Sequence, residues 1–429
     1  MTSNIIPTKK SSDSLNEPNI VTFGCRLNAY ESEVIRNHLH ATGLCNVIVV
    51  NTCAVTKEAE RQSRQTIRKL RREQPNARII VTGCAAQINP QKFATMYEVD
   101  QIIGNVEKLQ VASYLESNTE RILITDIMKI RNTSEHLITG FNNNVRAFVE
   151  IQQGCNHRCS FCIIPFSRGP SRSVPIDQIV NQIRYLMKSG FNEIVMTGVD
   201  ITAYGVDLHE HLNLGQMVRY LLKQLPYLPR LRLSSLDPIE IDNDLLQLIA
   251  EEPRLMPHFH LSIQSGNDTI LKRMKRRYLR SDVILLAKKL RNLRPDLALG
   301  ADIIAGFPTE TEEMFNQSLT LIDEIGISHL HVFPFSSRPG TLAENLPHLH
   351  KNVVKERASL LRDKGNIAMS TFLVSQIGSN ARVLIEKNNI GLCEHYLPVR
   401  LVNNIASVGN ILTVKITDIE NDLLIGRSV

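Results

Sequence analysis

The sequence has no long apolar run and few cysteines. No stretch among its 429 residues approaches the roughly 20 consecutive apolar residues that span a bilayer, and the segment MTSNIIPTKKSSDSLNEP has no apolar core of the secretory type. We therefore expect a cytoplasmic protein that does not cross a membrane. Without a secretory signal, the 8 cysteines are not expected to form a disulfide framework, so grouped cysteines are candidate metal ligands or reactive thiols.

The composition that remains is that of a globular protein. Hydrophobic residues make up 43% of the sequence and charged residues 21%, and a chain of this length can bury most of its apolar surface. At roughly 150 residues per domain, the length suggests about three domains. The net charge of +6 is modest, so it matters only where basic residues cluster.

The first part of the chain changes pattern twice. Residues 1–17 show no apolar periodicity and are expected to form a disordered tail. From 18 to 128, apolar runs such as NVIVV and ARIIV alternate with helical patterns, which predicts an α/β domain with a flavodoxin-like parallel sheet. Residues 129–145 lose this periodicity, gain Asn, Ser and Gly, and are expected to be a linker.

Two further domains are predicted after the linker. Between 146 and 370, six strand candidates alternate with amphipathic helices, which predicts a (βα)6 partial TIM barrel. In barrels of this kind the chemistry gathers at the carboxyl ends of the strands. From 371 to 429, short alternating strands without a convincing helix predict a small all-β domain.

Three cysteines lie immediately after the first strand predicted for the central domain. Cys155, Cys159 and Cys162 form CxxxCxxC in the segment QQGCNHRCSFC. Three thiolates fit a four-iron cluster with one iron left open, whereas a structural zinc site needs a fourth ligand, which His157 could supply. The motif resembles that of the radical S-adenosylmethionine (SAM) superfamily, whose open iron binds the amino and carboxylate groups of SAM.

Further segments fall at the ends of predicted strands, where that superfamily holds SAM. Glycines there would allow close approach of the backbone, polar side chains would supply hydrogen bonds, and an arginine could pair with the SAM carboxylate. Alternatively, each polar residue caps a helix or satisfies a loop. The candidate SAM-binding residues are Gly198, Asp200, Ser234, Gln264, Arg276, Asp302 and Gly306.

A second cysteine triplet is dispersed over the first domain. Cys25, Cys53 and Cys84 each follow a predicted parallel strand, so the sheet could bring all three to one crevice and form a second metal site. The alternative is that they are ordinary buried cysteines. Cys45 and Cys393 follow no such pattern, and we expect both to be packing residues.

Two separate triplets together resemble the radical SAM methylthiotransferases, and the resemblance extends over residues 18–429, including a TRAM-like C-terminal domain. It implies two 4Fe-4S clusters and SAM as cofactors. The cluster on Cys155, Cys159 and Cys162 would be catalytic, cleaving SAM to a radical that activates a C–H carbon, and the other cluster would deliver sulfur. It further implies a tRNA substrate, an electron donor such as flavodoxin or ferredoxin, and a monomeric enzyme.

Three strings bear on the substrate. NTCAVT, TGVDITAYG and RLRLSSLDP resemble the branch that acts on N6-threonylcarbamoyladenosine (t6A) next to the tRNA anticodon, which implies conversion of t6A to 2-methylthio-t6A. The other branches act on isopentenyl-adenosine in tRNA or on an aspartate of a ribosomal protein. A different class of function, a non-catalytic iron–sulfur protein that binds RNA, also remains open.

Basic residues cluster in two places, 61–72 and 272–280. Such runs could contact RNA phosphates, although a basic helix is more often a solvated face. The C-terminal segment has no clear set of aromatic residues for base stacking, so it adds only weak support for RNA binding.

Overall fold

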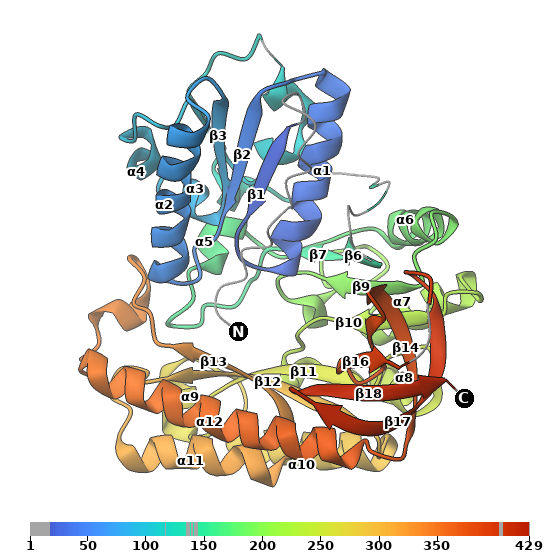
Figure 1. Ribbon diagram of the computed structural model, residues 1–429. Helices are drawn as coiled ribbons and strands as arrows, with labels where there is room; N and C mark the ends of the chain where they lie inside the picture. The colour runs from blue at the N-terminus through green and yellow to red at the C-terminus, as the bar shows by residue number, and fades with distance from the viewer. Residues whose placement is uncertain are drawn as a thin grey trace. The chain divides into compact units, whose positions relative to one another are not determined.

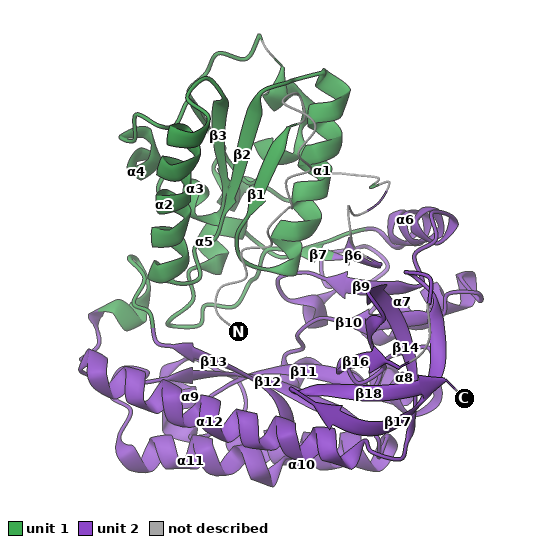
Figure 2. Ribbon diagram, in the orientation of Figure 1, with its two compact units in different colours: residues 1–138, 152–174, 336–344 green, residues 139–151, 175–335, 345–429 purple. Residues whose placement is uncertain are grey.

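The computed structural model describes residues 18–115, 117–133, 138, 140, 145–402 and 406–428. The tail predicted over residues 1–17 and part of the predicted linker lie outside these residues. The chain forms two compact units (Figure 2). The first comprises residues 1–138, 152–174 and 336–344, and the second comprises residues 139–151, 175–335 and 345–429. Both cysteine triplets therefore belong to the first unit.

The first unit is built on a parallel sheet. All five strands predicted from the apolar runs are present and lie in sequence order, β1-β2-β3-β4-β5. Every residue of β2 is buried, as expected for a central strand covered on both faces. The strands are β1 Asn19–Thr22, β2 Val47–Thr52, β3 Arg78–Gly83, β4 Gln101–Ile103 and β5 Ile122–Leu123.

Helices cover both faces of this sheet. Figure 1 shows helix α1 (Arg26–Thr42) and helix α2 (Lys57–Glu73) on either side of the sheet. Helix α1 packs Ile35 and Leu39 against one face, and α2 packs Ile67 against the other. The α/β fold class is confirmed. The strand order differs from the flavodoxin order of 2-1-3-4-5, so β1, β2 and β3 are direct neighbours. The shorter helices are α3 Cys84–Ile88, α4 Pro90–Ala94, η1 Glu107–Leu109, η2 Val111–Tyr114 and η3 Ile127–Lys129.

A later segment of the chain, residues 152–174, also belongs to the first unit. It begins with β7 (Gln152–Gln153), which pairs antiparallel with β8 (Arg172–Ser173). The loop after β7 carries the CxxxCxxC motif and leads into α5 (Ile164–Arg168).

The short helix η6 (Leu342–Asn345) follows much later in the chain.

The second unit contains the six strands predicted for the partial barrel. They form two parallel sheets, β10-β9-β6 and β11-β12-β13, and a parallel bridge between Leu236 and Leu261 connects the β10 segment to β11. This open run of parallel strands confirms the partial barrel. The strands are β6 Arg146–Glu150, β9 Glu193–Thr197, β10 Arg230–Leu233, β11 His258–Gln264, β12 Ala298–Ala305 and β13 Ile327–Pro334.

Helices alternate with these strands, and polar side chains start several of them. Asn213 and Gln216 form a capping box at α7, and Asp242 accepts a hydrogen bond from Leu245 N at α8. The helices are α6 Ile176–Lys188, α7 Leu214–Gln224, α8 Asn243–Glu251, α9 Asp268–Arg273, α10 Arg280–Leu293, α11 Glu312–Glu324, α12 Lys351–Ser375, η4 Ile201–Ala203 and η5 Pro238–Glu240.

The C-terminal strands close into a small barrel in the order β14-β15-β16-β18-β17, which confirms the all-β prediction. Pairing of β14 with β17 completes the closure, so none of these strands is left as an edge. The strands are β14 Asn380–Lys387, β15 Ile390–Leu392, β16 Pro398–Leu401, β17 Ile411–Glu420 and β18 Leu423–Ser428.

The two isolated cysteines differ in burial. Cys393 is 1% exposed and lies in the core of the C-terminal barrel, which confirms that it packs. The same prediction for Cys45 is wrong, because Cys45 is exposed. It lies in the turn before β2, and the buried strand begins only at Val47.

A buried ion network ties β9 and β10 to the C-terminal barrel within the second unit. The Glu193 carboxylate pairs with Arg230 at 3.2 Å and Arg232 at 2.9 Å, and all three side chains are fully buried. Arg230 donates to the carbonyl of Leu392 at 3.2 Å, and Arg232 donates to that of Glu394 at 3.0 Å.

Across the described part of the chain, no helix has the length and apolarity needed to cross a membrane.

Candidate functional site

The dispersed triplet lies at the carboxyl ends of three neighbouring strands. Cys25 caps the start of α1 directly after β1, Cys53 follows β2, and Cys84 begins α3 after β3. The helices that follow β1 and β2 pack on opposite faces of the sheet. The structure therefore brings these three cysteines together, as their places in the sequence predicted.

Two glycines lie beside this cysteine triplet. Gly24 has φ +100°, and a Cβ there would lie 2.9 Å from the Cys53 sulfur. Gly83 has φ +94°, and a Cβ there would lie 2.3 Å from the Thr52 carbonyl oxygen. Both backbone angles favour glycine, so the cysteine loops can approach one another only because these positions lack a side chain.

The three thiols of this triplet differ in burial. Cys53 and Cys84 are buried, whereas Cys25 is exposed. Burial, reinforced by the nearby Cys84 sulfur, raises the pKa of the Cys53 thiol to about 12. A thiolate in this position needs positive charge beside it, and a metal cluster supplies that charge as it binds the deprotonated sulfur.

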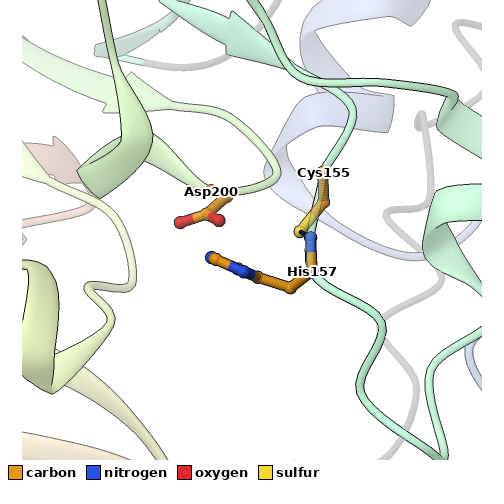
Figure 3. A group of neighbouring side chains, drawn as sticks. All are labelled: Cys155, His157 and Asp200. Atoms are coloured by element: carbon orange, nitrogen blue, oxygen red, sulfur yellow. Dashed lines mark hydrogen bonds between the residues drawn. The ribbon is translucent and has the colours of Figure 1, made fainter. Parts of the chain in front are cut away.

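The second triplet lies on a single loop of the same unit. Cys155 N donates to the carbonyl of Gly169 at 3.0 Å, and Cys162 N donates to that of Cys159 at 3.0 Å. The backbone N–H of His157 donates to the Cys155 sulfur at 3.3 Å. All three cysteines are half-buried. Figure 3 shows the Cys155 and His157 side chains on this loop, and draws Asp200 of the second unit as well.

The spacing of the sulfur atoms bears on which metal each triplet suits. Zinc with Zn–S bonds of about 2.3 Å in tetrahedral geometry places its sulfur ligands about 3.8 Å apart. Within the described ranges of the chain, neither triplet forms a group whose three sulfurs all lie within 4.8 Å of one another. An iron–sulfur cluster binds each thiolate on a different iron, which separates the sulfurs further. The assignment of an iron–sulfur cluster to either triplet therefore stays a prediction.

A buried charge network lies in the same unit. Glu31 of α1 is fully buried and pairs with Lys108 Nζ at 2.6 Å and with Arg168, whose side chain is 2% exposed. Burial alone would raise the pKa of Glu31, but Arg168 and Lys108 outweigh it and hold this pKa at about 2. The Glu31 carboxylate therefore stays ionised.

Sequence reasoning missed this network, although one signal was available. Glu31 lies four residues from both Leu27 and Ile35, so it falls on the buried stripe of an amphipathic helix. A carboxylate on such a stripe requires a buried partner. Nothing in the local pattern of Lys108 or Arg168 indicated that they would supply it.

Most of the candidate SAM-binding residues gather at strand ends of the second unit. Gly198 directly follows β9, Ser234 follows β10, and Gly306 follows β12. Gln264 ends β11 with φ +70°, a left-handed conformation that an L-residue adopts only under local constraint. These positions match the edge where a barrel places its chemistry.

Asp302, in the middle of β12, has partners on both neighbouring strands. Its Oδ1 lies 2.7 Å from His260 Nε2 and 3.4 Å from His331 Nδ1. These two histidines were not predicted as site residues. Gly300 makes room for one of them, since a Cβ there would lie 2.3 Å from His260 Nδ1.

Two other candidate SAM-binding residues also have partners inside the protein. Asp200 accepts a hydrogen bond from Thr202 Oγ1 at 2.9 Å. Arg276 donates to Asp237 at 2.9 Å and to the carbonyl of Ser262 at 3.0 Å. A role in SAM binding for these residues stays a prediction.

Acidic neighbours neutralise part of each basic cluster. In α2, the following side chains each pair with a carboxylate: Arg61, Arg64, Arg68, Lys69 and Arg71. In the second cluster, Arg276 and Arg277 pair with Asp237, and Arg280 pairs with Glu324. Such pairing leaves less charge for phosphates, so RNA contact at these segments stays a prediction.

Two family models match the chain. The radical SAM superfamily matches residues 149–322, and uncharacterized protein family UPF0004 matches residues 18–104. A solved structure of the radical SAM methyltransferase TsrM from Kitasatospora setae aligns with a TM-score of 0.53 at 14% identity, and covers 72% of this chain and 73% of that chain. At this identity the likeness concerns the fold alone.

Full-length relatives give a closer match. The threonylcarbamoyladenosine tRNA methylthiotransferase MtaB of Rickettsia prowazekii is 51% identical and covers 94% of this chain and 95% of its own. The MtaB of Aquifex aeolicus is 36% identical, covering 88% and 95%. A tRNA-2-methylthio-N6-dimethylallyladenosine synthase of Staphylococcus aureus is 34% identical, covering 82% and 73%. The family predicted from the cysteine motifs is confirmed: the chain belongs to the threonylcarbamoyladenosine tRNA methylthiotransferases of the radical SAM superfamily.

Proposed function

We propose that this chain converts t6A next to the tRNA anticodon into 2-methylthio-t6A, using two iron–sulfur clusters held by its two cysteine triplets. The observation that carries this proposal is the presence of both triplets in one compact unit, in a chain 51% identical to a t6A tRNA methylthiotransferase. Membership of the radical SAM superfamily implies SAM and one 4Fe-4S cluster, for which Cys155, Cys159 and Cys162 are the ligands we assign. The second cluster, on Cys25, Cys53 and Cys84, is our assignment.

The residues of the chain hold and separate these groups. When bound, the clusters and SAM supply electron transfer, radical chemistry, sulfur and the methyl group. Three thiolates on a loop anchor a cluster while leaving one iron without a protein ligand. Gly198, Ser234, Gln264 and Gly306, with Asp200, Asp302 and Arg276, would line the SAM pocket at the strand ends.

The chemistry implies a setting and a partner. Six cysteines that serve as cluster ligands must stay reduced, and tRNA is the substrate, so we place the enzyme in the cytoplasm. Reductive cleavage of SAM needs a one-electron donor, for which a flavodoxin or a ferredoxin is our choice. We take the working form to be a monomer, since one chain carries both triplets.

Mass spectrometry of digested tRNA tests the substrate. Deleting the gene should remove 2-methylthio-t6A and leave t6A in its place, and a plasmid copy should restore the product. A plasmid copy with Cys159→Ala is the matched control and should restore nothing. Loss of 2-methylthio-isopentenyl-adenosine instead, with 2-methylthio-t6A unchanged, would assign the chain to the other tRNA branch.

Reconstitution tests the chemistry independently of the substrate. Anaerobically reconstituted protein should bind about eight irons per chain. Under reducing conditions it should form 5′-deoxyadenosine from SAM. Iron binding without this product would favour a non-catalytic iron–sulfur protein, and zinc in place of iron would contradict both cluster assignments.

A further inference from the structure

Arg168 joins the two cysteine-bearing segments of the first unit. It ends the helix that follows the CxxxCxxC loop, yet its Nε donates to the sulfur of Cys84, from the other triplet, at 3.2 Å. Its two terminal nitrogens donate to Glu31 and to the amide oxygen of Asn28. Glu31 and Asn28 therefore hold the two terminal nitrogens of the guanidinium, and its Nε–H donates to a sulfur atom.

The Glu31 carboxylate that binds this arginine is buried and accepts hydrogen bonds from further side chains. Glu31 is fully buried on α1, the helix that Cys25 caps, and its carboxylate also accepts from Lys108 at 2.6 Å and from Gln153 at 3.1 Å. Because Arg168 shares this carboxylate with Lys108, its positive charge is not fully neutralised. Arginine stays protonated in proteins, so a fixed positive charge lies directly against the Cys84 sulfur.

The same network contacts both ends of the loop that carries Cys155, Cys159 and Cys162. Gln153 lies two residues before Cys155, and Arg168 lies six residues after Cys162. Both side chains donate to the Glu31 carboxylate. Lys108 is tied in by Asn105, whose Oδ1 accepts from its Nζ at 2.7 Å. One buried carboxylate therefore fixes the loop of one triplet to the helix that begins at the other.

We propose that Arg168 is a positioning residue that donates a hydrogen bond to the Cys84 ligand of the second cluster, the one on Cys25, Cys53 and Cys84, and raises the reduction potential of that cluster. This inference rests on the proposed function, because it takes Cys25, Cys53 and Cys84 to hold iron. A reduced cluster carries one more negative charge than an oxidised one. A fixed cation that donates to a ligand sulfur therefore favours the reduced state.

A redox titration followed by electron paramagnetic resonance tests the proposal. The measurement uses the full chain with Cys155, Cys159 and Cys162 changed to alanine, so that only the second cluster is reconstituted. Arg168→Met removes both the charge and the donor, and we expect its midpoint potential to become more negative. Arg168→Lys keeps the charge but loses the Nε donor, so its potential should fall between those of Arg168→Met and the parent.

The opposite change gives the proposal its sharpest test. Glu31→Gln removes the negative charge that partly neutralises Arg168, so its midpoint potential should become more positive. A purely structural role would loosen the site in both variants and would not move the potential in opposite directions. If Arg168→Met binds no iron, the contrast between Arg168→Lys and Glu31→Gln still decides the question.

Two controls separate the possible failures. Arg232→Met removes a buried arginine from a comparable pair with Glu193 in the second unit, and should leave the potential unchanged. The parent protein is the chain with Cys155, Cys159 and Cys162 changed to alanine. If it binds no cluster, the second cluster of the proposed function is contradicted. The other failure concerns Arg168 alone. If the parent protein binds four irons and its midpoint potential is the same in all three variants, the cluster assignment stands and the role of Arg168 is overturned. These variants are Arg168→Met, Arg168→Lys and Glu31→Gln.

Discussion

The two cysteine triplets of the first unit are built in opposite ways. Cys155, Cys159 and Cys162 lie on one loop, where the spacing of the motif alone keeps the three residues close in the chain. Cys25, Cys53 and Cys84 come from three strands and meet only because β1, β2 and β3 are neighbours in the sheet. The loop triplet depends on a short segment, whereas the strand triplet depends on the whole sheet. Substitutions should therefore affect the two triplets by different routes.

The largest expected effect comes from a substitution in the loop triplet Cys155, Cys159 and Cys162, which should abolish both SAM cleavage and thiomethylation. Cys159→Ala should abolish 5′-deoxyadenosine formation and thiomethylation, because two thiolates are too few to anchor the cluster that binds SAM. Chromatography of the SAM products measures the first reaction, and mass spectrometry of tRNA measures the second. Formation of 5′-deoxyadenosine at the wild-type rate would show that the loop triplet is misassigned.

Breaking the strand triplet should remove only one of the two reactions. Cys53→Ala should still cleave SAM, uncoupled from product formation, while thiomethylation is lost because the sulfur-delivering cluster lacks a ligand. Iron content should fall from about eight to about four per chain. Full thiomethylation by this variant would leave Cys25, Cys53 and Cys84 as structural cysteines.

A buried carboxylate in the second unit, which carries neither triplet, tests whether charge networks matter to iron binding in general. Glu193→Gln leaves Arg230 and Arg232 buried without their counter-charge, which should cost about 3 kcal/mol of unfolding free energy at pH 7. Iron content should not change. Urea unfolding and iron analysis of the same samples make the comparison, and loss of iron would contradict it.

The same variant has a predictable pH dependence. Burial raises the pKa of Glu193, but Arg232 and Arg230 outweigh it and lower this pKa to about 2. Since the value is depressed from about 4.3 in the unfolded chain, the contribution to stability is complete above that pH and is lost as pH falls toward 2. The difference between wild type and Glu193→Gln should therefore narrow below about pH 4.

The sheet geometry around the strand triplet can be broken without touching a cysteine. Gly83→Ala would place a Cβ 2.3 Å from the Thr52 carbonyl at φ +94°, which should cost about 2 kcal/mol and weaken iron binding at Cys84. Gly43→Ala is the matched control, since it also has a positive φ, at +65°, but nothing within 4 Å of the added Cβ. It should cost about 1 kcal/mol and leave iron binding intact.

The same contrast between local and dispersed structure explains what the sequence could predict. The periodicity of apolar residues predicted the strands that the cysteines follow. The CxxxCxxC spacing is a local feature that can be read directly from the sequence. The meeting of Cys25, Cys53 and Cys84 also followed from the rule that parallel strands share one carboxyl edge. These inferences need only short-range patterns and one topological rule.

Contacts between distant side chains could not be inferred in this way. Arg168 meets Glu31 across 137 positions of the chain, and no local pattern selects that partner. His260 and His331 approach Asp302 because their strands are neighbours in register, which periodicity does not specify. The wrong prediction for Cys45 has a simpler cause: Cys45 lies in the turn before β2, and the buried strand begins only at Val47.

The smallest effects should come from the cysteines outside both triplets. Cys393→Ser places a hydroxyl in an apolar core and should cost about 1 kcal/mol, while SAM cleavage, thiomethylation and iron content stay at wild-type levels. Cys45→Ser, at an exposed turn, should change stability by less than about 0.5 kcal/mol. Thermal unfolding and iron analysis check both variants. Loss of iron in either would mean that cluster binding extends beyond the two triplets, and the division between local and dispersed ligands would have to be redrawn.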